Sequence, residues 1–121
     1  MIGFIKSLFG MGGEGIGPRE AVQRMNRGAV LVDVRESNEY ANGHAPSARH
    51  VPLGCIRNEG PAALDALQLA PESDEVLLIC QSGMRSRMAQ NVLSKDARRR
   101  YINVDGGMAA WANSGLPVKR T

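Results

Sequence analysis

Three short, nearly continuous apolar runs punctuate the chain. They cover residues 29–34, 76–80 and 101–104. Runs of this length without polar alternation are typical of strands buried on both faces, as in parallel sheets. A fourth extended piece, over residues 50–53, is interrupted by Pro52, which favours a short edge strand.

Helical patterns separate these runs. The first is predicted to begin at Gly17-Pro18, since proline suits the first helical position, and to end at Gly28. Composition and apolar spacing predict further helices over residues 36–42, 61–67, 84–93 and 108–113. Strand and helix thus alternate with short connections, which predicts an α/β fold with a central parallel sheet and helices on both faces.

Polar and reactive side chains lie at the carboxyl ends of two predicted strands. Asp33 and Arg35 follow the first strand, and Cys80 ends the second. Ligands of open parallel sheets bind outside the carboxyl ends of the strands. We therefore expect these three residues near one rim of the sheet.

The chain is predicted to hold one domain, over residues 17–121, after a flexible tail of residues 1–16. The first ten residues are apolar with one lysine, and residues 10–17 are rich in glycine. The apolar stretch is too short to span a bilayer and lacks the parts of a secretory signal, so we expect a cytoplasmic protein without a transmembrane segment. One face of the tail could still contact a partner or a membrane, through Ile2, Ile5, Leu8 and Phe9.

Composition narrows the function classes. The 121 residues carry a formal net charge of +3, with one dense basic run at residues 98–100 and no nucleic-acid recognition motif, so we expect no nucleic-acid partner. The two cysteines, Cys55 and Cys80, form no CxxC, and the Cys and His residues lack zinc-ligand spacing. We expect neither a metal nor a cofactor.

Cys80 is the strongest candidate for chemistry. It stands between an apolar strand and a predicted helix, and it is followed by Gln81, Ser82, Gly83, Met84, Arg85 and Ser86. Such a turn points backbone N–H groups inward and favours an anion at its centre. A fall in thiol pKa from about 8.5 to about 6.5 would raise the thiolate fraction at neutral pH from roughly 3% to roughly three quarters. The alternative is an inert buried cysteine that closes a core strand.

This loop resembles the active-site loop of rhodaneses. Further segments in family order resemble the other rhodanese signatures, so that the resemblance spans residues 17–118: Asp33-Val34-Arg35-Glu36, Glu39-Tyr40, Gly43-His44, Val51-Pro52-Leu53, Gly106-Gly107 with Trp111, and Gly115-Leu116-Pro117-Val118. The chain departs from the pattern at Ala45, where a bulky apolar residue is usual, and at Ser47, where glycine is usual.

The resemblance implies a rhodanese-like fold and a sulfurtransferase that carries sulfur as a persulfide on Cys80. A small anionic donor such as thiosulfate would supply the sulfur, and cyanide, a thiol or a protein acceptor would remove it. The residues that follow Cys80, from Gln81 to Arg85, would form an anion cradle, supported by Ser86. Asp33 would bond to this loop, and Arg35 would either attract donors or form an ion pair, with Glu39 as a candidate partner.

Three other functions stay open. A phosphatase or arsenate reductase of related fold would need five residues between cysteine and arginine, whereas four separate Cys80 from Arg85. A non-catalytic binding module and a protein-to-protein sulfur carrier are the other two. Cys55 is expected to be an ordinary thiol, with a resolving thiol as the alternative, and His44 is expected to have a packing or capping role.

Overall fold

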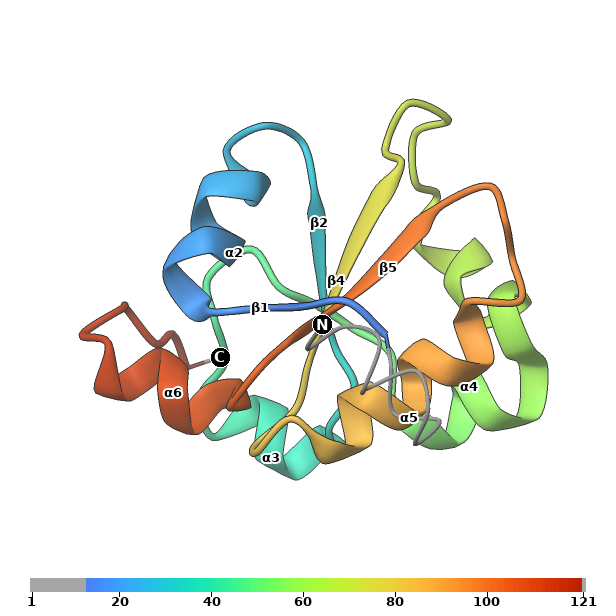
Figure 1. Ribbon diagram of the computed structural model, residues 1–121. Coiled ribbons are helices and arrows are strands. Elements are labelled where there is room, and N and C mark those ends of the chain that lie inside the picture. The colour runs from blue at the N-terminus through green and yellow to red at the C-terminus, as the bar shows by residue number, and fades with distance from the viewer. Residues whose placement is uncertain (1–12, 121) are drawn as a thin grey trace.

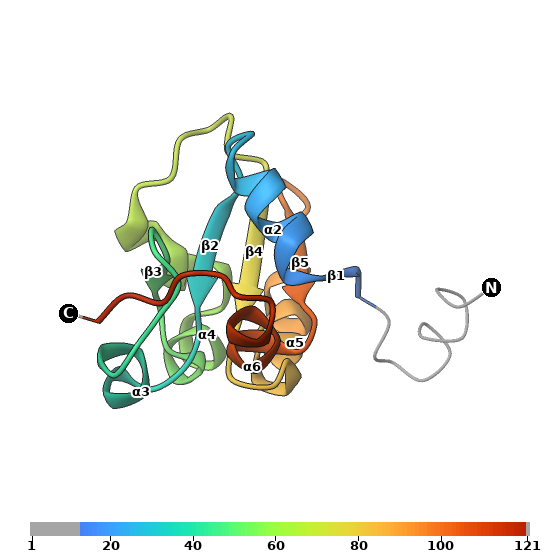
Figure 2. The same ribbon diagram turned by 90° about the vertical axis from the view of Figure 1, so that its left-hand side faces the viewer.

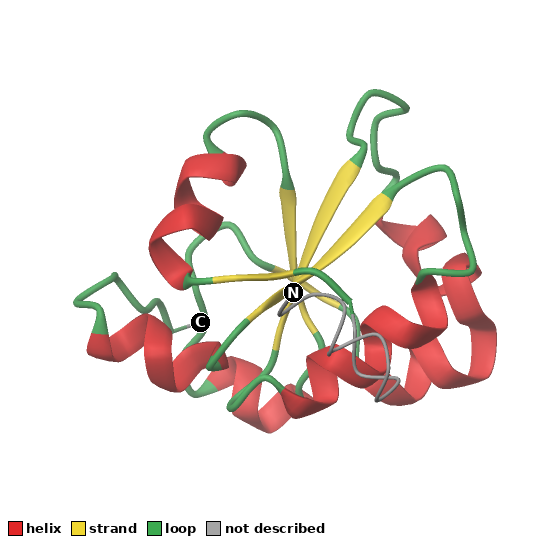
Figure 3. Ribbon diagram, viewed as in Figure 1, coloured by secondary structure: helices red, strands yellow, loops and turns green. Residues whose placement is uncertain are grey.

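The computed structural model describes residues 13–120, which form one sheet with helices on both faces (Figure 1). The five strands, yellow in Figure 3, are all parallel and lie in the order β1-β5-β4-β2-β3. The sequence predicts the parallel sheet but not the order of its strands. Their bounds are Gly15–Ile16 (β1), Val30–Asp33 (β2), Arg49–His50 (β3), Glu75–Ile79 (β4) and Arg100–Val104 (β5).

Helices α2 and α6 lie in front of the sheet in Figure 2, and α4 and α5 lie behind it. The helical elements are α2 (Pro18–Met25), α3 (Ser37–Ala41), α4 (Leu53–Glu59), the 3-10 helix η1 (Gly60–Leu67), α5 (Met84–Leu93) and α6 (Gly107–Asn113). The prediction of an extended piece through residue 53 is wrong at its end, because α4 begins there. Within residues 13–120, no helix has both the length and the apolar character needed to cross a bilayer.

The apolar strands supply both halves of the core. Val32 and Leu78 contribute to the cluster beneath α4 and α5, whereas Leu31 and Leu77 contribute to the cluster beneath α2 and α6. All four side chains are at most 1% exposed. Alternate residues of a strand point to opposite faces, so a strand covered on both faces must be apolar at nearly every position.

The amino-terminal edge of the domain corrects one prediction. The sequence predicts a flexible tail that includes Gly15 and Ile16, but these residues form β1, which pairs with β5 at the edge of the sheet. The backbone before β1 is held as well, since Arg87 Nη1 donates to the Gly13 carbonyl at 2.7 Å and the Asn103 N–H donates to the Glu14 carbonyl at 2.9 Å. Residues 1–12, including the proposed apolar face, lie outside the described residues.

The turn between α3 and β3 holds the two departures from the rhodanese pattern. Ser47 has a φ of +70°, in the left-handed region where glycine is favoured. Ala45 is fully buried, and His44 stacks on Tyr40 with ring centroids 3.8 Å apart. Nδ1 of His44 lies 2.8 Å from the Tyr40 carbonyl oxygen, so His44 has the packing role that the sequence suggested.

Candidate functional site

The carboxyl ends of β2 and β4 lie side by side, as the sequence predicted. The parallel register pairs Asp33 with Ile79, and the Val34 N–H donates to the Ile79 carbonyl at 2.9 Å. The segment after Asp33 and the Cys80 loop (residues 80–86) therefore leave the sheet at neighbouring points. Helices α3 and α5 begin at this edge, at the bottom of Figure 1.

The Cys80 loop encloses the thiol of Cys80. The sulfur accepts a hydrogen bond from the Gly83 N–H at 3.1 Å and another from the Ser86 hydroxyl at 3.3 Å, and Cys80 is only 1% exposed. Gly83 has a φ of +103°, which lets the backbone turn its N–H toward the sulfur before α5 begins. In the part of the chain that the structure describes, the loop thus directs one backbone donor and one side-chain donor at the sulfur.

These donors determine the ionisation of Cys80. Burial raises the pKa of the thiol, but the Ser86 hydroxyl and the backbone N–H groups of Ser86, Gly83 and Ser82 all lower it, and the balance leaves the pKa below its ordinary value. Hydrogen bonds that favour the charged form outweigh the loss of solvation here. The thiolate is the nucleophilic form of cysteine, so this geometry favours reactivity.

Ser86→Ala is expected to raise the pKa of Cys80, because it removes the only side-chain donor to the sulfur within residues 13–120. The pH profile of Cys80 alkylation by iodoacetamide, read on the Cys80 peptide, should then move to higher pH. Ser94→Ala, at the exposed far end of α5, is the matched control and should leave the profile in place. An unmoved profile in Ser86→Ala would contradict this account of the thiolate.

A second turn, at residues 106–107 between β5 and α6, packs against the Cys80 loop. The N–H groups of Met108 and Ala109 donate to the carbonyls of Cys80 and Gln81, at 2.8 and 3.1 Å. The approach requires Gly107, since a Cβ there would lie 2.4 Å from the Cys80 carbonyl oxygen. The sequence offers Gly106-Gly107 only as part of the resemblance to rhodaneses, and nothing in it places this turn against the Cys80 loop.

Arg85 belongs to this loop but is not a free charge. Its two terminal nitrogens bond both carboxylate oxygens of Glu39, at 2.7 and 2.9 Å, and about a third of each side chain is exposed. The hydrogen bond from Arg85 lowers the pKa of Glu39 to about 2. The suggested pairing of Glu39 with Arg35 is therefore wrong: Arg85 takes that carboxylate.

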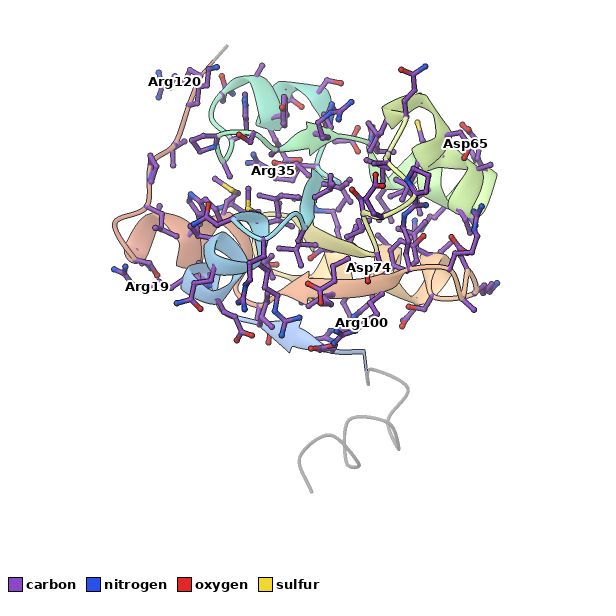
Figure 4. The ribbon with its side chains drawn as sticks, turned by 90° about the horizontal axis from the view of Figure 1, so that it is seen from above. Arg19, Arg35, Asp65, Asp74, Arg100 and Arg120 are labelled. Atoms are coloured by element: carbon purple, nitrogen blue, oxygen red, sulfur yellow. The ribbon has the colours of Figure 1, made fainter. Side chains whose placement is uncertain are left out.

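Arg35 instead pairs with Asp33. Within residues 13–120, the Asp33 carboxylate accepts hydrogen bonds only from Arg35, including one from Nη2 at 2.8 Å, and both side chains are buried. The expected bond from Asp33 to the Cys80 loop is therefore wrong. Arg35, labelled in Figure 4, is the residue that reaches the loop, with Nη1 3.5 Å from Gln81 Oε1.

The remaining predicted residues lie on the outside of the loop. Gln81 and Ser82 are exposed, and the Met84 side chain is 71% exposed.

Cys55 is an exposed free thiol on α4, in contrast to the buried Cys80. Arg87 pairs with Asp105 at 3.0 Å and therefore adds no uncompensated charge to the helix start.

Comparisons with known proteins agree with this geometry. A family model described as the Rhodanese-like domain matches residues 17–114. A sulfurtransferase from Allochromatium vinosum is 35% identical over 89 residues, which cover 74% of this chain and 77% of that protein. The putative sulfur carrier protein YrkF of Bacillus subtilis is 40% identical over 81 residues, which cover 67% of this chain but only 40% of YrkF.

Solved structures show the same fold. The crystal structure of a rhodanese-related protein from Thermoplasma volcanium superposes with a TM-score of 0.73 at 23% identity, covering 89% of this chain and 99% of that one. A thiosulfate sulfurtransferase from Pseudomonas aeruginosa gives a TM-score of 0.74 at 19% identity, covering 98% of this chain and 22% of that one. With the family match over residues 17–114, this chain belongs to the family of rhodanese-like domains.

Proposed function

We propose that this protein is a sulfurtransferase that moves sulfane sulfur from a donor such as thiosulfate to cyanide or a thiol, through a persulfide on Cys80. The observation that carries the proposal is the buried sulfur of Cys80, which receives hydrogen bonds from Gly83 and Ser86 at the start of α5. This surrounding stabilises an anionic sulfur, which is the state needed both before and after sulfur is loaded.

The reaction has two displacement steps at sulfur. In the first, the Cys80 thiolate attacks the outer sulfur of thiosulfate; a new S–S bond forms, the S–S bond of thiosulfate breaks, and sulfite leaves with the electron pair. In the second, cyanide attacks the outer sulfur of the persulfide and leaves as thiocyanate, which regenerates the Cys80 thiolate. A thiolate acceptor would leave as its own persulfide.

The Cys80 loop would serve both steps without an acid or base. Neither step transfers a proton when the thiolate reacts with an anionic sulfur donor. Hydrogen-bond donors that already point at the sulfur are therefore sufficient to stabilise its negative charge. Gly83 and Ser86 would bind the sulfur, and the N–H of Ser82 would further stabilise its negative charge. The loop residues Gln81, Ser82, Met84 and Arg85 would line the path by which a donor arrives.

Names of related proteins support sulfur transfer in general. The relatives include proteins named sulfurtransferase, thiosulfate sulfurtransferase GlpE and putative sulfur carrier protein. The 40% identity to YrkF keeps a protein-to-protein carrier as the second candidate. A carrier would take sulfur onto Cys80 from a protein donor and pass it to a protein acceptor. The four-residue spacing between Cys80 and Arg85 argues against a phosphatase.

Steady-state kinetics test the proposal. Thiocyanate production from thiosulfate and cyanide should give parallel double-reciprocal lines, because sulfite leaves before cyanide reacts. Intersecting lines would indicate that both substrates bind together, without a persulfide. A folded, reduced protein that produces no thiocyanate would favour the carrier or a binding module.

A further inference from the structure

Most of the positive charges around the Cys80 loop are already compensated. Three arginines lie on or next to the loop, and each has a carboxylate partner: Arg35 with Asp33 at 2.8 Å, Arg85 with Glu39 at 2.7 Å, and Arg87 with Asp105 at 3.0 Å. The net charge of these three pairs is zero. The site thus combines donors that hold an anionic sulfur with surroundings that offer a highly charged donor little attraction.

We propose that Glu39 sets the donor preference of this site: by neutralising Arg85, it disfavours dianions such as thiosulfate and favours sulfur carried with a single charge, as in the persulfide of a thiol. This inference rests on the proposed function, since it concerns which donor loads Cys80. With a persulfide donor, the Cys80 thiolate would attack the outer sulfur, the donor's S–S bond would break, and a thiolate would leave with the electron pair.

The position of Glu39 is fixed from both sides. Its Oε1 also accepts the Glu36 N–H at 3.0 Å, in a capping box at the start of α3. The two bonds from Arg85 then hold the carboxylate against the first turn of α5. The negative charge of Glu39 is therefore held in a fixed position next to Arg85, and an arriving donor meets both charges together.

The exposed surface next to the loop suits a thiol carrier better than a hydrated inorganic ion. Met84 is 71% exposed and Met88, one turn further along α5, is 41% exposed. Arg57, from α4, lies against Met88 with Nη2 3.3 Å from its sulfur and forms no salt bridge within residues 13–120. Thiosulfate therefore still meets one free cation nearby, so we expect a preference and no strict exclusion.

Glu39→Gln removes the charge and keeps the shape of the side chain. The glutamine oxygen can still accept bonds from Arg85 Nη1 and from the Glu36 N–H, and only the bond from Arg85 Nη2 is lost. A unit charge about 7 Å from the donor in water, at low ionic strength, changes the rate for a dianion about fivefold and for a monoanion about twofold. We therefore expect kcat/KM to rise about fivefold with thiosulfate and about twofold with methanethiosulfonate, a singly charged donor. Both gains should shrink below about twofold in 0.5 M salt.

Glu20→Gln is the matched control. Glu20 also pairs with an arginine, Arg24, at 2.8 Å. This pair lines a cavity together with the first residues of β4 and β5, at the amino ends of the strands and thus away from the Cys80 loop. This variant changes the net charge by the same amount. It should leave unchanged the ratio of kcat/KM with thiosulfate to kcat/KM with methanethiosulfonate. Arg85→Gln, which leaves Glu39 uncompensated, should move that ratio in the opposite direction from Glu39→Gln and tests the assignment with a second variant.

The outcomes separate two failures. If the wild-type protein turns over both donors and the ratio of kcat/KM values is the same in Glu39→Gln, Arg85→Gln and Glu20→Gln, the assignment of Glu39 is overturned and the proposed function stands. If the folded wild-type protein takes sulfur from neither donor, the proposed function falls, and the assignment falls with it. A ratio that rises in Glu39→Gln alone and falls in Arg85→Gln supports the assignment.

Discussion

Replacing Cys80 with serine should lower the rate of sulfur transfer by at least about a thousandfold, because a neutral hydroxyl is a weak nucleophile and cannot form a persulfide. The substitution changes one atom at a site that is 1% exposed, and the hydrogen bonds from Gly83 and Ser86 can be made to oxygen as well. The expected loss is therefore chemical. Thiocyanate release from thiosulfate and cyanide measures it, with thermal unfolding as the check on the fold.

Cys55→Ser provides the control for thiol chemistry elsewhere in the chain. Cys55 is exposed on α4, and no hydrogen bond joins its side chain to the Cys80 loop within residues 13–120. We expect its rate to stay within about twofold of the original, as for most surface substitutions. Equal losses in the two variants would mean that Cys55 takes part in the reaction.

Arg35→Leu should lower the free energy of unfolding by about 3–5 kcal/mol, because it leaves a buried carboxylate without its partner. The Asp33 side chain is fully buried, and every side-chain donor that it meets within residues 13–120 belongs to Arg35. Arg35 also donates to the Gly43 carbonyl at 2.7 Å, which would lose that bond. Chemical denaturation at neutral pH measures the change.

Two variants show whether burial is the cause. Arg98 pairs with Asp96 at the same two-residue spacing, but the Arg98 side chain is 74% exposed, and Asp96, itself 8% exposed, also accepts a hydrogen bond from the Tyr101 hydroxyl at 2.8 Å. Because Asp96 keeps that donor, Arg98→Leu should cost less than Arg35→Leu. The double variant Asp33→Asn with Arg35→Leu should recover part of the loss, because no charge is then buried. Equal effects of Arg35→Leu and Arg98→Leu would contradict the structural role of Arg35.

The sequence predicted most of the sheet because its central strands are covered on both faces. Such strands must be apolar at nearly every position, which makes residues 29–34 and 76–80 easy to recognise. Elements at the edge lack that signal. Strand β1 is only Gly15–Ile16, and α4 follows Pro52 with Gly54 inside it, so neither has a pattern long enough to predict.

The site was predicted as far as local chain order determines it. Cys80, Gly83 and Ser86 follow one another along a strand, a turn and a helix, so their proximity is a local matter. The charge pairs are not local. Glu39 is four residues from Arg35 and 46 from Arg85, yet it pairs with Arg85, because α3 and α5 begin at neighbouring strand ends.

The central claim is that Cys80 carries sulfur, and the most direct measurement is the mass of the intact protein after incubation with thiosulfate and then with cyanide. The account predicts a gain of one sulfur atom, located on the Cys80 peptide and absent from Cys80→Ser, that cyanide removes as thiocyanate. A reduced, folded protein that gains no sulfur, or gains it equally in Cys80→Ser, would contradict the account.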